Sequence, residues 1–96
     1  SNLVKTQRIM ALYERMKTEV PRITRSQYAI QAIDALFDRP VFQTSDFADR
    51  VGVSKSTAER ILRQLKETDI VHTLRPQLGR RAAVMVFAEL VQIAEG

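Results

Sequence analysis

The 96-residue sequence predicts a mainly α-helical domain with one small β-hairpin, on three observations. Apolar residues recur at spacings of three and four in several segments, which is the period of an amphipathic helix. Two such segments, residues 44–51 and 54–67, are joined by a short turn that contains Gly52. After the second segment, two stretches typical of strands enclose a loop that carries Pro76 and Gly79. These features together predict a winged helix-turn-helix preceded by a long N-terminal helix.

The first expected element is an amphipathic helix over residues 3–20, which should end at Pro21. Its apolar stripe consists of Ile9, Leu12, Tyr13, Met16 and Val20. Met10 lies off the centre of this stripe, and an apolar residue there suits contact with a second subunit or a neighbouring domain. We therefore expect residues 3–20 to be a connecting or dimerisation helix and residues 24–96 to be the winged-helix domain.

A second helix is expected to begin at Thr24, because Thr24 and Gln27 have the spacing of a capping box. Its apolar positions are Ala29, Ile30, Ile33, Leu36 and Phe37. Pro40 ends this helix, and the extended stretch over residues 41–43 is expected to pair with a strand from the end of the domain.

The helix-turn-helix begins at Thr44 or Ser45, either of which can cap the next helix. That helix should bury Phe47, Ala48 and Val51. Gly52 supplies the positive φ at which the helix can stop. An ordinary αα-hairpin with a solvated cationic face would give a similar pattern, and the hairpin that follows favours the helix-turn-helix.

The helix over residues 54–67 is the predicted recognition helix, with Ser54 as its cap. Its inward positions are Ala58, Ile61, Leu62 and Leu65, and its outward positions are Lys55, Ser56, Glu59, Arg60, Arg63 and Lys66. Such a helix can present its polar N-terminal half to a major groove.

Residues 70–74 and 82–87 are predicted strands, and the loop over residues 75–81 is the predicted wing. This loop carries three arginines and no acid, namely Arg75, Arg80 and Arg81. Arginines there suit contact with phosphates or with a minor groove. The alternative is a solvated hairpin that needs cations only for solubility. A short helix over residues 88–96 should pack on the domain or on a partner.

Charge and composition limit the classes of function and partner that we expect for this chain. The net charge is +4, and residues 55–81 alone contain seven basic and three acidic residues. The excess therefore lies where a nucleic-acid-binding surface is expected. The chain has no cysteine, which fits a cytoplasmic protein without disulfides or a cysteine-based zinc site. No apolar run is long enough for a membrane span and no signal peptide opens the chain, so no membrane partner is expected.

The sequence offers no catalytic group, metal site or cofactor site. His72 is the only histidine and lies in a predicted strand without a nucleophile or a carboxylate cluster at a suitable spacing. The chain has three glycines, which form no phosphate-binding loop. We therefore expect that this chain is not an enzyme by itself.

Several segments resemble the C-terminal part of bacterial Fic (filamentation induced by cAMP) proteins. They are TQRIMALYERMK at residues 6–17, SQYAIQAIDALF at 26–37, LRPQLGRRAAVMVF at 74–87 and IAEG at 93–96. In that family a helical domain with the motif H-P-F-x-x-G-N-G-R transfers AMP from ATP to a protein hydroxyl, and a winged helix often follows. The motif is absent here. The resemblance implies a winged-helix module separated from its Fic catalytic domain, with residues 3–20 as the connection.

Two functions follow from these features. The first is binding of double-stranded DNA, with Lys55, Ser56, Thr57, Arg60 and Arg63 at the bases and Lys66, Arg75, Arg80 or Arg81 at the phosphates. A palindromic site would require a homodimer, for which the N-terminal helix is the expected contact. The second is a protein-interaction module that positions, regulates or dimerises the Fic enzyme without binding DNA. Glu59 in the middle of the reading surface and the small net charge favour the second function.

Overall fold

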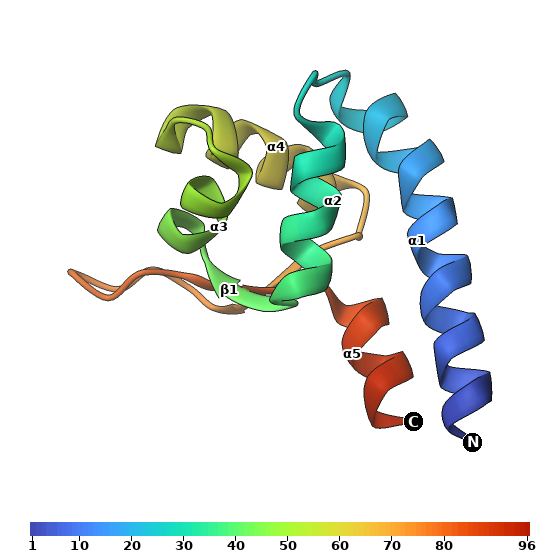
Figure 1. Ribbon diagram of the computed structural model, residues 1–96. Helices are drawn as coiled ribbons and strands as arrows, with labels where there is room; N and C mark the ends of the chain where they lie inside the picture. The colour runs from blue at the N-terminus through green and yellow to red at the C-terminus, as the bar shows by residue number, and fades with distance from the viewer.

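A computed structural model, which describes residues 1–96, contains five helices and a three-stranded antiparallel sheet (Figure 1). In chain order the elements are α1 (Asn2–Thr24), α2 (Ala29–Asp38), β1 (Val41–Gln43), α3 (Thr44–Val51), α4 (Lys55–Glu67), β2 (His72–Arg75), β3 (Val84–Val86) and α5 (Ala88–Glu95). The long α1 lies along one side, and the β2–β3 hairpin extends away from the helices on the opposite side (Figure 1). The predicted fold class, a winged helix-turn-helix preceded by a long helix, is confirmed.

The predicted end of the first helix at Pro21 is wrong, because α1 continues through Pro21 to Thr24. Proline removes one intrahelical hydrogen bond and crowds the preceding turn, which normally ends a helix. Here the last turn carries two residues into the core, since Val20 and Thr24 are buried. The Thr24 hydroxyl also donates to the Val20 carbonyl oxygen at 2.8 Å. Burial of this turn offsets the lost bond.

The predicted capping box of the second helix is also wrong, because Thr24 belongs to α1 and α2 begins at Ala29. The hydroxyls build the connecting turn instead. The Thr24 hydroxyl accepts from the Ser26 N–H at 3.3 Å, and the Ser26 hydroxyl accepts from the Tyr28 N–H at 3.0 Å. The core that α2 joins also contains three residues of α1, namely Leu12, Met16 and Val20. This packing does not test the division of the chain into residues 3–20 and 24–96, which stays a prediction.

The sheet has the order β1-β3-β2, and both pairs of strands are antiparallel. Residues 41–43 pair with β3 in the register Phe42↔Met85, which confirms the pairing predicted for this stretch. The strands of the hairpin are shorter than predicted. Ile70 and Val71 continue the end of α4 instead, because both N–H groups donate to the Leu65 carbonyl oxygen. Asp69, with a φ of 62°, supplies the left-handed residue of this turn.

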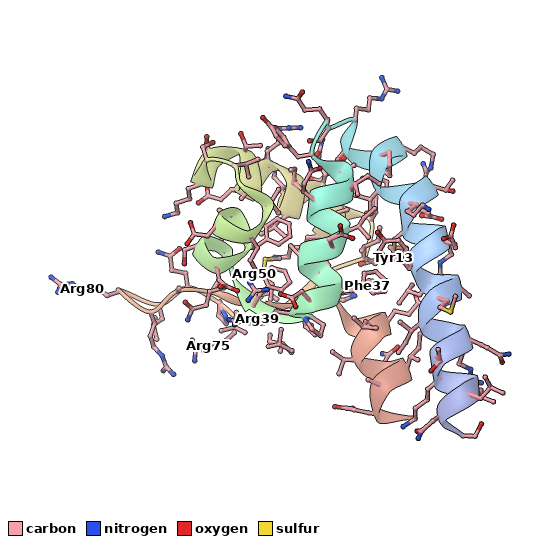
Figure 2. All side chains as sticks on the ribbon, in the orientation of Figure 1. Tyr13, Phe37, Arg39, Arg50, Arg75 and Arg80 are labelled. Atoms are coloured by element: carbon pink, nitrogen blue, oxygen red, sulfur yellow. The ribbon has the colours of Figure 1, made fainter.

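Helix α1 is attached to the rest of the domain by aromatic and polar contacts. The rings of Tyr13 and Phe37 are 5.1 Å apart, and those of Phe37 and Phe87 are 5.3 Å apart, both edge to face. The Tyr13 hydroxyl donates to the Asp34 carboxylate at 2.7 Å, and this hydrogen bond raises the pKa of the Tyr13 phenol. Figure 2 shows Tyr13 and Phe37 facing each other between α1 and α2.

The terminal helix α5 packs on this domain, against α1. Its Leu90 is buried and its Ile93 packs against the core. Ala94, near the end of this helix, is exposed. The side of α1 that faces α5 also supplies Arg15, which forms an ion pair with Glu89. The two ends of the chain therefore lie close together (Figure 1).

Candidate nucleic-acid interface

The turn of the helix-turn-helix forms as the sequence predicted. Gly52 ends α3 with a φ of 83° and a ψ of 37°. The N–H groups of Gly52 and Val53 donate to the Ala48 carbonyl oxygen at 2.9 and 3.1 Å. A Cβ atom built on Gly52 would meet no atom within 4 Å. Glycine is therefore favoured here by its backbone conformation and not by a lack of space.

The predicted cap of α3 is wrong, because Thr44 and Ser45 both lie inside the helix. Gln43 occupies the N-cap position, and its side chain makes no capping hydrogen bond. The extended conformation of β1 continues up to Gln43, so the helix starts directly at Thr44. The hydroxyl groups of Thr44 and Ser45 are consequently not used as caps.

Helix α4 confirms the predicted inward face, since Ala58, Ile61, Leu62 and Leu65 are buried. Ser54 is its N-cap, and its hydroxyl accepts from the Thr57 N–H at 3.2 Å. Lys55, Ser56, Glu59, Arg63 and Lys66 are exposed. The other two predicted contact residues, Thr57 and Arg60, are half-buried. The Thr57 hydroxyl also accepts from the Ser54 hydroxyl at 3.1 Å, so it is part of the cap.

The cations of this surface differ from most others in having no acidic partner. Of the 15 lysines and arginines, six form an ion pair within 4.0 Å. Arg50, for example, bonds Asp38 and Asp46, and Arg39 contacts Asp46. Nine cations are left without an ion pair, and six of these lie on α4 or the wing. These six are Arg60, Arg63, Lys66, Arg75, Arg80 and Arg81.

Lys55 is the exception on α4, because its ammonium group lies 3.9 Å from a Glu59 carboxylate oxygen. Both side chains are largely exposed, at 75% and 53%. An exposed pair at this distance contributes little to stability. It does place one negative charge within the cationic surface.

The wing ends in a tight two-residue turn. Leu78 and Arg81 exchange backbone hydrogen bonds of 3.1 and 2.9 Å, and Gly79 and Arg80 lie between them. Gly79 has a φ of 57°, which glycine adopts without strain. Arg80 and Arg81 are exposed, and Arg80 reaches out from the far end of the hairpin (Figure 2).

Arg75 lies at the base of the wing and not near its tip. It is the last residue of β2, and its side chain is half-buried. One guanidinium nitrogen donates to the Ala82 carbonyl oxygen at 3.4 Å, whereas Nε is buried without a partner. This arginine therefore braces the two sides of the wing. The register shifts between Thr73 and Arg75, and this places Arg75 opposite Val84 of β3.

A cleft of about 230 Å³ separates α4 from the wing. It is lined by Thr44, Ser45, Lys55, Glu59, Gln77, Gly79, Arg80, Ala82 and Ala83. The fold thus brings together Lys55 and Arg80, which are 25 residues apart in the sequence. It also brings Thr44, Ser45 and Gln77 to this surface. The sequence pattern did not indicate these three, because their position depends on how α3 and the wing pack.

Two further features concern the search for a metal site and for a membrane-spanning helix. No group of three or more histidine, cysteine, aspartate or glutamate side chains is placed to hold a metal ion. His72 is exposed on β2. None of the helices has the length and apolar character that crossing a membrane requires.

The fold is similar to that of a known protein. A mutant of Lactococcus lactis ZitR in its apo form superposes with a TM-score of 0.51 and 14% sequence identity, covering 99% of this chain and 68% of that chain. At this identity the likeness concerns the fold alone. No protein-family model matches the sequence, and the comparison with curated proteins gives no match. None of these comparisons links the chain to Fic proteins.

Proposed function

We propose that this chain is a DNA-binding module that holds double-stranded DNA between α4 and the wing. The observation that carries the proposal is the set of six unpaired cations on these two elements. A cation that is already paired with an acidic side chain gains little binding free energy from a phosphate, because the acidic side chain must first be displaced. Cations without partners release the counterions of the phosphates they meet, and this release drives binding.

In this proposal the exposed side of α4 reads bases in the major groove. The residues assigned to the bases are Lys55, Ser56, Thr57, Arg60 and Arg63. Arg60 and Arg63 have no acidic partner, so each guanidinium is free for the bidentate contact with guanine that arginine commonly makes. Thr57 contributes mainly through the cap, because its hydroxyl is bonded to Ser54.

Phosphate contacts are assigned to Lys66 on α4 and to three arginines of the wing, Arg75, Arg80 and Arg81. Arg80 and Arg81 are exposed beside the cleft or at the tip and need no rearrangement. Arg75 would have to exchange its bond to the Ala82 carbonyl oxygen for a phosphate, so we assign it the smallest share.

The second part of the proposal concerns a longer protein to which this chain would belong. On the resemblance of residues 6–17, 26–37 and 74–87, we propose that the chain is the C-terminal part of a cytoplasmic bacterial Fic-type AMP transferase. Helix α1 would then connect the missing catalytic domain to the winged helix. A full-length protein that lacks the H-P-F-x-x-G-N-G-R motif before this segment, or that transfers no AMP, would contradict this assignment.

A protein-interaction module is the second candidate, and two observations favour it. Glu59 places a negative charge on the reading surface, 3.9 Å from Lys55. On α1, a mostly apolar hollow of about 250 Å³ is lined by Ile9, Met10, Tyr13, Glu14 and Phe37, and Met10 is 64% exposed. This hollow suits a second copy of the chain or the catalytic domain. A homodimer through α1 is compatible with both functions, because α1 lies away from the wing (Figure 1).

Fluorescence anisotropy with mixed-sequence duplex DNA tests the first function. If about four phosphates are neutralised, the logarithmic salt slope is about −3.6, and affinity falls about 150-fold between about 50 and 200 mM salt. Arg80→Ala should weaken binding to every sequence and flatten the slope by about one. Arg60→Ala should instead relax preference at one position, at a cost of about 1–3 kcal/mol.

Arg8→Ala is the matched control, because Arg8 is an exposed cation without an ion pair on α1. It should leave both the affinity and the salt slope unchanged. No binding at about 50 mM salt would refute the DNA-binding function and favour the interaction module. Equal losses for Arg60→Ala and Arg80→Ala on all sequences would contradict base reading by α4.

A further inference from the structure

The tip of the wing exposes the most accessible large apolar side chain of the molecule. Leu78 is 74% exposed, compared with 67% for Leu3, 64% for Met10 and 59% for Leu74. Single exposed leucines are common on protein surfaces and need no special explanation. The position of Leu78 is what distinguishes it from the others.

Leu78 is held in place by the backbone of the turn. It exchanges two backbone hydrogen bonds with Arg81 across Gly79 and Arg80. The leucine is not part of the core or of the partly buried residues that pack against it. Because the hairpin extends away from the helices, its tip can be covered only by another molecule (Figure 2).

The surroundings of Leu78 indicate an anionic partner. Arg80 and Arg81 are exposed next to it, and the chain contains no acidic residue between Asp69 and Glu89. A partner that accepts both an apolar side chain and these arginines needs negative charge around an apolar slot. The minor groove of DNA has this character, since phosphates line its edges and stacked bases lie at its floor.

We propose that Leu78 enters the minor groove as an apolar wedge, partly opens one base step and kinks the duplex beside the α4 site. This inference rests on the proposed DNA-binding function. Leucine is one of the side chains that minor-groove proteins insert between base steps. Opening is easiest at flexible pyrimidine–purine steps, so the wedge should select such a step. Arg80 and Arg81 would bind phosphates that flank the opened step.

A lipid surface is the other anionic partner that an apolar tip with arginines suits. The cleft argues for DNA. Its walls carry Lys55 from α4 and Arg80 from the wing, so one extended polyanion meets both elements together. A flat surface touched by the tip alone would leave the unpaired cations of α4 without a partner.

The test uses the whole 96-residue chain with duplexes that carry 2-aminopurine at successive positions and a donor and acceptor dye at the two ends. Binding should raise 2-aminopurine fluorescence at a single step and shorten the end-to-end distance. A duplex with a TA step there should bind more tightly than one with an A-tract. Leu78→Ala should remove all three effects. Leu74→Ala, which changes an exposed leucine further from the tip, should keep them.

The possible outcomes separate the wedge from the proposed function. A normal chain that binds DNA without a fluorescence change, or a Leu78→Ala variant that kinks DNA as the normal chain does, overturns the wedge but not DNA binding. Equal losses for Leu74→Ala also overturn it, because the apolar surface of the wing would then act as a whole. No DNA binding at about 50 mM salt overturns both proposals. Leu78-dependent binding to phosphatidylserine vesicles in that case would assign the tip to a lipid surface.

Discussion

Replacing Gly52 with alanine tests whether the turn between α3 and α4 depends on backbone conformation. A Cβ atom at this position meets nothing within 4 Å, so no steric clash contributes. The left-handed conformation, with a φ of 83°, costs an ordinary residue about 1–2 kcal/mol. Alanine also loses less chain entropy on folding, which returns about 0.4–1 kcal/mol. The net loss in the free energy of unfolding should therefore lie between about 0 and 1.6 kcal/mol, with a middle value of about 0.8 kcal/mol.

Chemical denaturation and thermal unfolding measure this loss. For a domain of this size, 1 kcal/mol lowers Tm by about 4–8 °C. Gly52→Asn is the control, because asparagine tolerates the left-handed region, and it should lose less than Gly52→Ala. A loss above about 3 kcal/mol for alanine would refute the reasoning, because it would require a clash that the structure does not contain. A gain in stability for Gly52→Ala would refute the need for a positive φ.

Three further predictions concern the cap, the ion-pair network and the reading surface. Ser54→Ala should lower the free energy of unfolding by about 1 kcal/mol, because the Ser54 hydroxyl caps α4. Ser45→Ala should change it little, because Ser45 lies inside α3 and is not its cap. Equal losses in denaturation would contradict the assigned caps. Arg50→Ala should lower the free energy of unfolding by about 1 kcal/mol in the same assay, since the Arg50 side chain is mostly buried while Asp38 and Asp46 are more exposed. An unchanged free energy would mean that these two ion pairs add nothing to stability. Glu59→Gln should strengthen DNA binding on all sequences, because it frees Lys55, and unchanged anisotropy would exclude this competition.

Local features of the sequence were sufficient to predict the helix-turn-helix. Gly52 marks the turn, Ser54 marks the start of α4, and the spacing of apolar residues marks its inward face. Each of these signals acts over a few residues, so tertiary packing does not need to be known. The pairing of residues 41–43 was also predictable, because an extended stretch before a helix needs a strand partner.

The errors occur where tertiary packing overrides a local signal. Pro21 normally ends a helix, but burial of Val20 and Thr24 extends α1 by one more turn. Thr24 then becomes unavailable as the cap of α2. In the wing, the sequence placed Arg75 with the tip arginines, whereas it pairs with Val84 in the sheet and donates to the Ala82 carbonyl oxygen. Register and burial depend on residues distant in the sequence, which periodicity alone does not contain.

Net charge alone is a poor guide to this surface, and the ion pairs explain why. A total of +4 is small for a nucleic-acid-binding domain and equally suits a module that binds nothing acidic. Yet acids pair with most cations of the body, such as Arg15 and Arg50, and largely leave those of α4 and the wing unpaired. Phosphate binding depends on these local, uncompensated charges. The salt slope should therefore follow the few cations of α4 and the wing, and neutralising a paired arginine of the body should leave it unchanged.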